Sequence, residues 1–494
     1  MRTTVGLLLT AALAVGGLAT SPLTPLTPPA AAAPEPGTPA YVERDARNVV
    51  AAYGRITEQQ LGNPAYLPAL VEQSTLVGVA QLLEQAASPT RPSVTPGALV
   101  PGWNVGNPLR ASWDGTRGRM REVSFTNRYG ALLRGTLYAP LRRDARGPFP
   151  GVVITEGSVQ GSEGMYRWLA QDLAERGYLV LTYDVQGQGT SETLPHDGSP
   201  VDALPFCDLL GEPAPGEQTT CPGVPSQQIS NFVVGTEDAL DFFTSRPGKR
   251  YPRHGAAADE VDAFNPWHRL FDRSRDPRPN APGRTTRIAI VGHSLGAAAV
   301  SQVQAYDDRV STVVALDKLG LEPPSGTDAG SEPLRPVVPA LAVQSEYGFT
   351  VSPYFTSGGS SITPQPSPKG PDPRRERATG FDLWRDAGVD SMLVVPRAST
   401  HLEYTDIPLV LPASRHGQAL TSVYVQRWLD HYLAHRTGIK PLLAKRFRYA
   451  EPVGGGEWRP VRLRRDPLLS FYYCSAWSLR DGRRSKPDVT GVGC

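Results

Sequence analysis

The pentapeptide Gly292-His293-Ser294-Leu295-Gly296 has the residue types and the spacing of a nucleophile site. It follows an apolar run at residues 287–291 that is typical of a buried strand, and an alanine-rich stretch typical of a helix comes directly after it. A serine at such a strand-to-helix turn is held exposed, while the flanking glycines leave room for strained backbone and close packing. The pattern therefore predicts that Ser294 is the nucleophile of an enzyme.

A serine hydroxyl is a weak nucleophile at neutral pH, so it needs a base, and the base needs a group that orients it. His401 fits the base because it follows the apolar run at 391–395, the last strand expected in this architecture. His293 lies inside the turn, where we expect it to pack or to point away from the substrate.

Two acidic residues are candidates for orienting the imidazole. Asp317 ends the apolar run at 312–316, and Glu346 follows the next apolar run, at 340–343. Either carboxylate could accept a hydrogen bond from the histidine. We favour Asp317 and keep Glu346 as the alternative, with the other acid acting as a structural hydrogen-bond partner.

A tetrahedral intermediate also needs hydrogen-bond donors for its oxyanion. The usual donors are backbone N–H groups directly after the nucleophile and in the loop after an early strand. These positions correspond to Leu295 and to Ser158, which follows the apolar run at 151–155. We expect the N–H groups of these two residues to bind the oxyanion.

The elements that must position these residues alternate between apolar strands and amphipathic helices. Strands are expected at 122–126, 132–138, 151–155, 178–183, 287–291, 312–316, 340–343 and 391–395. Helical spacing is found at 41–87, 165–173, 232–243 and 418–436. Continuous apolar strands separated by helices predict an α/β protein whose central sheet is mostly parallel and covered by helices on both faces.

The chain divides into four segments by pattern and composition. Residues 1–32 resemble a signal peptide, with Arg2 before an apolar run at 5–19 that is short for a membrane span. We expect an N-terminal helical extension and linker at 33–118, a catalytic domain at 119–445, and an irregular tail at 446–494. Three long insertions interrupt the catalytic domain, at 192–228, 247–285 and 351–379.

Composition and cysteine content fit an exported, soluble protein. The 494 residues are 40% hydrophobic and 20% charged, with a formal net charge of +2, so neither a disordered chain nor a nucleic-acid partner is expected. Four cysteines in an exported chain predict two disulfides. Local pairing is favoured, Cys207 with Cys221 and Cys474 with Cys494, and no metal site is expected.

In these residues the sequence resembles the α/β-hydrolases, and within them the platelet-activating-factor acetylhydrolases and the secreted, cutinase-like polyester hydrolases. Residues 290–296 match the nucleophile motif, Ala315-Leu316-Asp317 matches the acetylhydrolase motif that carries the acid, and Ser399-Thr400-His401 matches the histidine loop. The resemblance implies the α/β-hydrolase fold and implies that Asp317 is the acid. The cutinase-like members place an aspartate after the later strand, where this chain has Gly348.

We therefore predict a secreted serine hydrolase that cleaves carboxylic esters through Ser294, His401 and Asp317, without a metal or cofactor. The expected partner is a small-molecule, lipid or polymer ester, and no stable membrane span is expected. Two alternatives stay open: a secreted peptidase or amidase with the same residues, and a non-catalytic binding protein built on a hydrolase-like scaffold.

Overall fold

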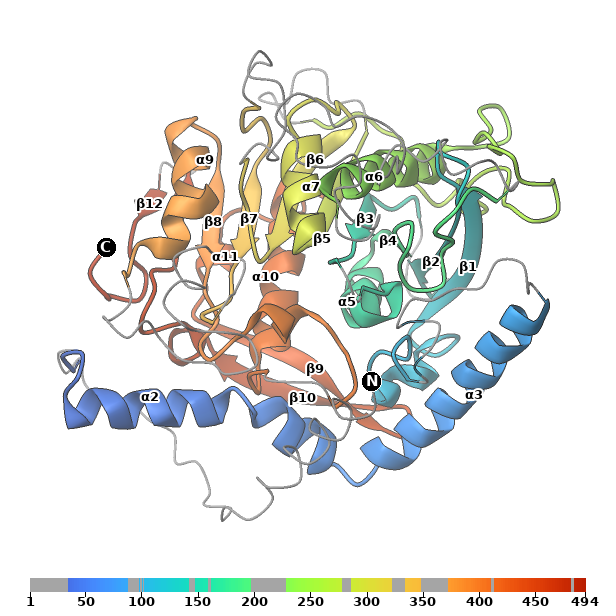
Figure 1. Cartoon of the computed structure of the whole chain (residues 1–494). Helices are drawn as coiled ribbons and strands as arrows, with labels where there is room; N and C mark the ends of the chain where they lie inside the picture. Colours follow the sequence, from blue (N-terminus) through green and yellow to red (C-terminus); the bar gives the residue numbers. More distant parts are fainter. Residues whose placement is uncertain are drawn as a thin grey trace, which may run out of the picture. The chain divides into compact units, whose positions relative to one another are not determined.

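Short, wholly buried apolar runs form the strands of a central sheet in the computed structural model of the chain (Figure 1). The structure describes residues 34–87, 97, 100, 102–141, 147–158, 161–196, 228–277, 286–321, 334–347, 372–409, 413–480 and 484–494. The predicted signal peptide at 1–32 and the predicted pair Cys207 and Cys221 lie outside these residues. Residues 36–494 form one unit.

Ten strands of the described residues form one sheet, in the order β1-β2-β4-β3-β5-β6-β7-β8-β11-β12. They are β1 (Gly118–Thr126), β2 (Leu132–Pro140), β3 (Gly151–Thr155), β4 (Leu179–Tyr183), β5 (Ile288–His293), β6 (Val310–Leu316), β7 (Ala340–Val343), β8 (Ser391–Val394), β11 (Ala476–Leu479) and β12 (Arg484–Lys486). All pairs from β4 to β8 are parallel, and the outer pairs are antiparallel. The predicted α/β class with a large, mostly parallel central sheet is therefore confirmed.

Parallel pairing decides where the site can be. The carboxyl ends of β3, β5, β6, β7 and β8 all lie along the same edge of the sheet. Loops that leave these ends can therefore bring together residues that are far apart in the sequence.

Helices cover both faces because successive strand residues point to opposite sides. Val152 and Val180 pack in the hydrophobic cluster that includes side chains of α5 and α10, whereas Val153 and Leu181 pack in the cluster that includes α6 and α7. The described α-helices are α2 (Pro39–Ala51), α3 (Tyr66–Ala87), α5 (Arg167–Arg176), α6 (Ile229–Thr244), α7 (Leu295–Val303), α9 (Asp382–Asp386), α10 (Gly417–Tyr432) and α11 (Lys440–Leu443).

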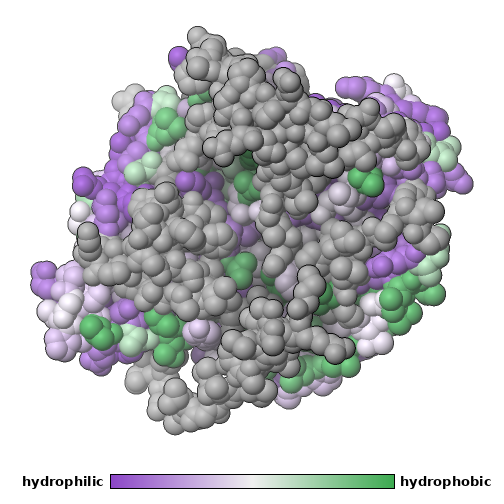
Figure 2. All heavy atoms as spheres, in the orientation of Figure 1, coloured by the Kyte–Doolittle hydropathy of each residue, from purple (hydrophilic) through white to green (hydrophobic). Residues whose placement is uncertain are grey.

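The N-terminal region is helical as predicted, but α3 turns its large apolar residues outward. Val71 is 66% exposed and Leu82 is 69% exposed, while the small and polar Gly78 and Gln81 are buried. Figure 2 shows hydrophobic side chains at the lower right, where Figure 1 places α3. No helix of the described residues has the length and apolar character needed to cross a membrane.

The prediction of an irregular C-terminal tail is wrong. Residues 446–494 contain β11 and β12, which extend the central sheet, and a separate hairpin of β9 (Arg446–Gly454) and β10 (Glu457–Arg464). Apolar residues and arginines alternate in this hairpin with the period of a strand, and a search for helical spacing overlooks that period. The predicted disulfide between Cys474 and Cys494 is confirmed.

The described part of the insertion at 247–285 packs against the core. Tyr251 and Phe271 are buried, and Phe271 forms an isolated bridge with Phe149 before the amino end of β3. The bridge therefore lies at the end of β3 that is opposite the carboxyl end, and it is the carboxyl end that leads to Ser158.

Candidate active site

Ser294 occupies a strained turn between β5 and α7. Its backbone has φ 56° and ψ −123°, a region that non-glycine residues rarely adopt. A Cβ atom at Gly292 would lie 2.1 Å from the carbonyl oxygen of Gly296, and one at Gly296 would lie 2.2 Å from the carbonyl oxygen of Glu156. Both glycines are therefore needed for close packing, and the side chain of Ser294 is partly exposed, as predicted.

The imidazole of His401 meets the hydroxyl of Ser294. His401 comes from the loop after β8 and begins the 3-10 helix His401–Tyr404. Its Nε2 lies 3.0 Å from the Oγ of Ser294, across 107 residues of sequence. The structure thus brings together the two residues that the sequence predicts as nucleophile and base.

Asp317, rather than Glu346, contacts the imidazole. The Nδ1 of His401 donates a hydrogen bond to the Oδ2 of Asp317 at 2.6 Å, and the hydroxyl of Ser345 donates to the same oxygen at 2.5 Å. Burial by itself would raise the pKa of Asp317, but the hydrogen bond and charge of His401, with the help of Ser345, lower it. An ionised Asp317 keeps the proton on Nδ1, so Nε2 can accept the proton of Ser294.

Glu346 supports the loop that carries His401 and does not contact the imidazole itself. It is fully buried and accepts hydrogen bonds from the backbone N–H of Ala398 at 2.8 Å and from the hydroxyl of Ser470 at 2.6 Å. The side-chain amide of Asn48, in α2, donates to the same carboxylate. Burial raises the pKa of Glu346, while these donors act in the opposite direction. The alternative acid is therefore placed as a structural partner.

The loop after β3 lies against the nucleophile. A Cβ atom at Gly157 would lie 3.1 Å from the Cβ of Ser294, so the next residue, Ser158, begins beside the expected reaction centre. Leu295 opens α7 directly after Ser294. The side chain of Gln188 holds the loop by donating to the carbonyl oxygen of Gly157 at 2.7 Å. The oxyanion role of Ser158 and Leu295 stays a prediction that this arrangement permits.

His293 and Tyr166, close to Ser294, form contacts that the sequence did not indicate. His293 is buried, as expected of a residue that points away from the substrate, and its Nδ1 lies 2.7 Å from the hydroxyl of Tyr166. The Nε2 of the same ring lies 2.9 Å from the carbonyl oxygen of His401. Tyr166 ends the 3-10 helix Glu163–Tyr166, where it reads in sequence as one more apolar residue at helical spacing.

Buried carboxyl groups gather near the loop after β3. Burial, reinforced by the charge of Glu163, raises the pKa of Asp184 to about 7. Asp184 accepts from the backbone N–H of Thr190 at 2.7 Å and so organises the turn that follows β4. Burial raises the pKa of Glu156 well above its ordinary value, and the charge of Asp184 is the second cause in the same direction.

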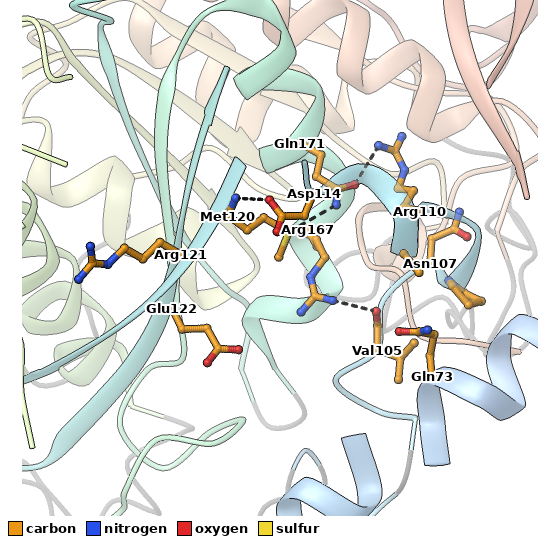
Figure 3. A pocket seen from close by; sticks show the side chains of 12 residues that line it. Gln73, Val105, Asn107, Arg110, Asp114, Met120, Arg121, Glu122, Arg167 and Gln171 are labelled. Atoms are coloured by element: carbon orange, nitrogen blue, oxygen red, sulfur yellow. Dashed lines mark hydrogen bonds between the residues drawn. The ribbon is translucent and has the colours of Figure 1, made fainter. Parts of the chain in front are cut away.

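A separate cavity of about 410 Å³ is lined by residues of α3, β1 and α5 and of the segment before β1 (Figure 3). Its arginines contact other residues: Arg167 donates to the carbonyl oxygen of Val105 at 3.4 Å, and Arg110 donates to Asp172 at 2.9 Å. Ser294, Asp317 and His401 do not line this cavity.

The comparison with known proteins assigns no activity to this chain. No family model matches the chain. The chain is similar to an uncharacterized protein of Pseudomonas aeruginosa, with 33% identity over 139 residues. That match covers 25% of this chain and 36% of the relative.

Proposed function

We propose that the protein is a secreted serine hydrolase of the α/β-hydrolase fold that cleaves carboxylic esters. The observation that carries the proposal is the hydrogen-bonded series from Ser294 through His401 to the buried Asp317, with distances of 3.0 and 2.6 Å. A nucleophile, a base and an orienting acid in this order are the parts that acyl transfer requires. The positive φ of Ser294 and the parallel strands that lead to all three residues support the same interpretation.

In the proposed reaction, the Oγ of Ser294 attacks the ester carbonyl carbon while its proton passes to the Nε2 of His401. The imidazolium then gives that proton to the departing alcohol, and an acyl-enzyme is left. Water, deprotonated by the same imidazole, attacks the acyl carbon; the bond between that carbon and Oγ then breaks, the carboxylic acid leaves, and the imidazolium returns a proton to Oγ of Ser294. Asp317 stabilises the imidazolium throughout and fixes its tautomer.

The N–H groups of Ser158 and Leu295 would bind the oxyanion of both tetrahedral intermediates. Leu295 opens α7, so the positive end of the helix dipole supports negative charge at this position. No metal or cofactor takes part in the proposed mechanism.

Secretion is part of the proposal. It rests on the charged start and short apolar run of residues 1–32 and on the disulfide between Cys474 and Cys494, a bond that persists in oxidising compartments.

The test is a series of nitrophenyl esters of rising acyl length, assayed beside peptide nitroanilides, with the wild type and Ser294→Ala. We expect ester hydrolysis by the wild type and a loss on the order of 10⁴-fold or more in the variant. Turnover of the peptides alone would replace the esterase proposal with a peptidase. A folded wild type that a fluorophosphonate does not label at Ser294 would favour the non-catalytic alternative.

A further inference from the structure

A tyrosine and a histidine that the proposed mechanism does not use lie directly behind Ser294. Tyr166 and His293 are both nearly fully buried, and their rings are in contact, with centroids 5.7 Å apart. Three hydrogen bonds join them to the loops of the site: Gly157 N–H to the Tyr166 hydroxyl at 2.9 Å, that hydroxyl to His293 Nδ1 at 2.7 Å, and His293 Nε2 to the His401 carbonyl oxygen at 2.9 Å.

The direction of each bond follows from the available protons. The backbone N–H of Gly157 can only donate, so the Tyr166 oxygen accepts from it and donates its own proton to Nδ1 of His293. The ring proton of a neutral His293 is then on Nε2, from which it is donated to the carbonyl oxygen of His401. Burial, together with the charge of His401, lowers the pKa of His293 to about 3, so the neutral ring required here is the stable form.

This series of hydrogen bonds connects the oxyanion loop, the nucleophile and the base of the proposed reaction. Gly157 precedes the expected oxyanion donor Ser158, His293 precedes the nucleophile Ser294, and the carbonyl group belongs to the base His401 itself. We propose that Tyr166 and His293 are positioning residues that fix the oxyanion loop and the base at their working distances from the nucleophile. The inference rests on the proposed function, because it assigns a role in the same reaction.

The expected consequence is a selective loss of turnover. Misplacing a reacting group by about 1 Å can cost on the order of 10²-fold in rate, and losing one oxyanion donor costs about 10²–10³-fold. Tyr166→Phe removes only a hydroxyl, and it leaves the N–H of Gly157 and Nδ1 of His293 without their partner. We expect kcat to fall about 10- to 100-fold, with KM within about twofold of the wild type.

Tyr404→Phe is the matched control. Tyr404 is also buried against His293, with ring centroids 5.6 Å apart, but its hydroxyl has no hydrogen-bond partner among the described residues. Its removal is expected to leave both kcat and KM unchanged.

The experiment measures kcat and KM on a nitrophenyl ester, together with the rate and the final extent of fluorophosphonate labelling of Ser294. A positioning role predicts that Tyr166→Phe slows labelling but still reaches full labelling, because every molecule is folded. Incomplete labelling that accounts for the whole loss of turnover would mean that the hydroxyl only stabilises the fold, and would overturn the proposal.

Two substitutions at His293 separate the two halves of the series. Asn can replace Nδ1 as the acceptor for Tyr166 but cannot reach the carbonyl oxygen of His401, whereas Gln can reach that carbonyl and loses Tyr166. We expect both His293→Asn and His293→Gln to lower kcat. Wild-type kcat in Tyr166→Phe and in both His293 variants, with Ser294→Ala inactive, would overturn this inference alone. Full activity in Ser294→Ala would overturn the proposed function and this inference with it.

Discussion

The carboxylate of Glu346 accepts a hydrogen bond from the backbone N–H of Ala398, three residues before His401, at 2.8 Å. The acid that the sequence offers as the alternative partner of the imidazole thus holds the loop that carries the imidazole. Asp317 contacts the ring itself, so the two acids have separable effects.

Asp317→Asn should lower kcat by about 10³–10⁴-fold with little change in stability, because the amide favours the wrong tautomer of His401. Glu346→Gln should keep kcat within about tenfold, since its carbonyl oxygen can still accept from Ala398 while its amide donates to Ser470. Steady-state kinetics of the two variants on one nitrophenyl ester checks the assignment. Equal losses in both would leave the assignment of Asp317 as the acid unsupported.

Asn48→Ala should lower the free energy of unfolding by about 1–3 kcal/mol. The side chain donates to Glu346 and to the hydroxyl of Tyr347, and it accepts from Arg397 at 2.9 Å, so its loss leaves buried polar groups unpaired. Urea denaturation measures the change. Val50→Ala, on an exposed position of α2, is the control and should stay within about 0.5 kcal/mol of the wild type. A stability equal to that of the control would show that α2 does not support the histidine loop.

Gly296→Ala should abolish ester hydrolysis and lower the melting temperature. The added Cβ would lie 2.2 Å from the carbonyl oxygen of Glu156, so either α7 or the loop after β3 must move away from Ser294. At Gly248 an added Cβ meets no atom within 4 Å, and Gly248→Ala should therefore change neither property. Activity and thermal unfolding of the two variants can be measured side by side. Wild-type activity in Gly296→Ala would contradict the tight packing that we describe around the turn.

Stability should rise with pH between about 3 and 6.5 through the contribution of His293. Burial lowers its pKa from 6.5 to about 3 in the folded protein, so in this range the unfolded chain binds a proton that the folded chain does not. By linkage the free energy of unfolding then gains up to about 1.4 kcal/mol per pH unit from this residue. Other groups titrate in the same range, and Asp184, whose pKa burial raises to about 7, acts in the opposite direction.

The difference between the wild type and His293→Asn isolates the contribution of the histidine. Urea denaturation at pH 4 and at pH 6.5 should show a smaller gain with pH in the variant. The same gain in both proteins would mean that His293 is protonated in the folded state.

The sequence predicts the fold best where one local rule dominates. The strands at 151–155 and 340–343 were predicted residue for residue, because each is a continuous apolar run that the sheet buries on both faces. Ser294, Asp317 and His401 could be nominated because each follows such a strand, and parallel pairing brings strand ends to one edge.

The parts that sequence reasoning missed depend on long-range contacts. Tyr166 reads as an ordinary apolar residue of a helix, and only its contact with Gly157 and His293 distinguishes it. The N-terminal helices and the C-terminal tail had no visible relation to the site. Their relation lies in Asn48 and Ser470, which meet at Glu346 although they are far apart in the chain.

The position of the tail has a consequence for biosynthesis. Residues 468–475 hydrogen-bond along the segment that follows β8: the carbonyl oxygen of Leu468 accepts from Arg397, and the hydroxyl of Ser475 accepts from Val395. These residues are synthesised after residues 395–401, the loop that they hold. The loop that carries His401 therefore gains these contacts only after translation has passed residue 475, and a nascent chain that stops short of residue 468 already contains the nucleophile, the acid and the base but lacks the segment that holds the base's loop.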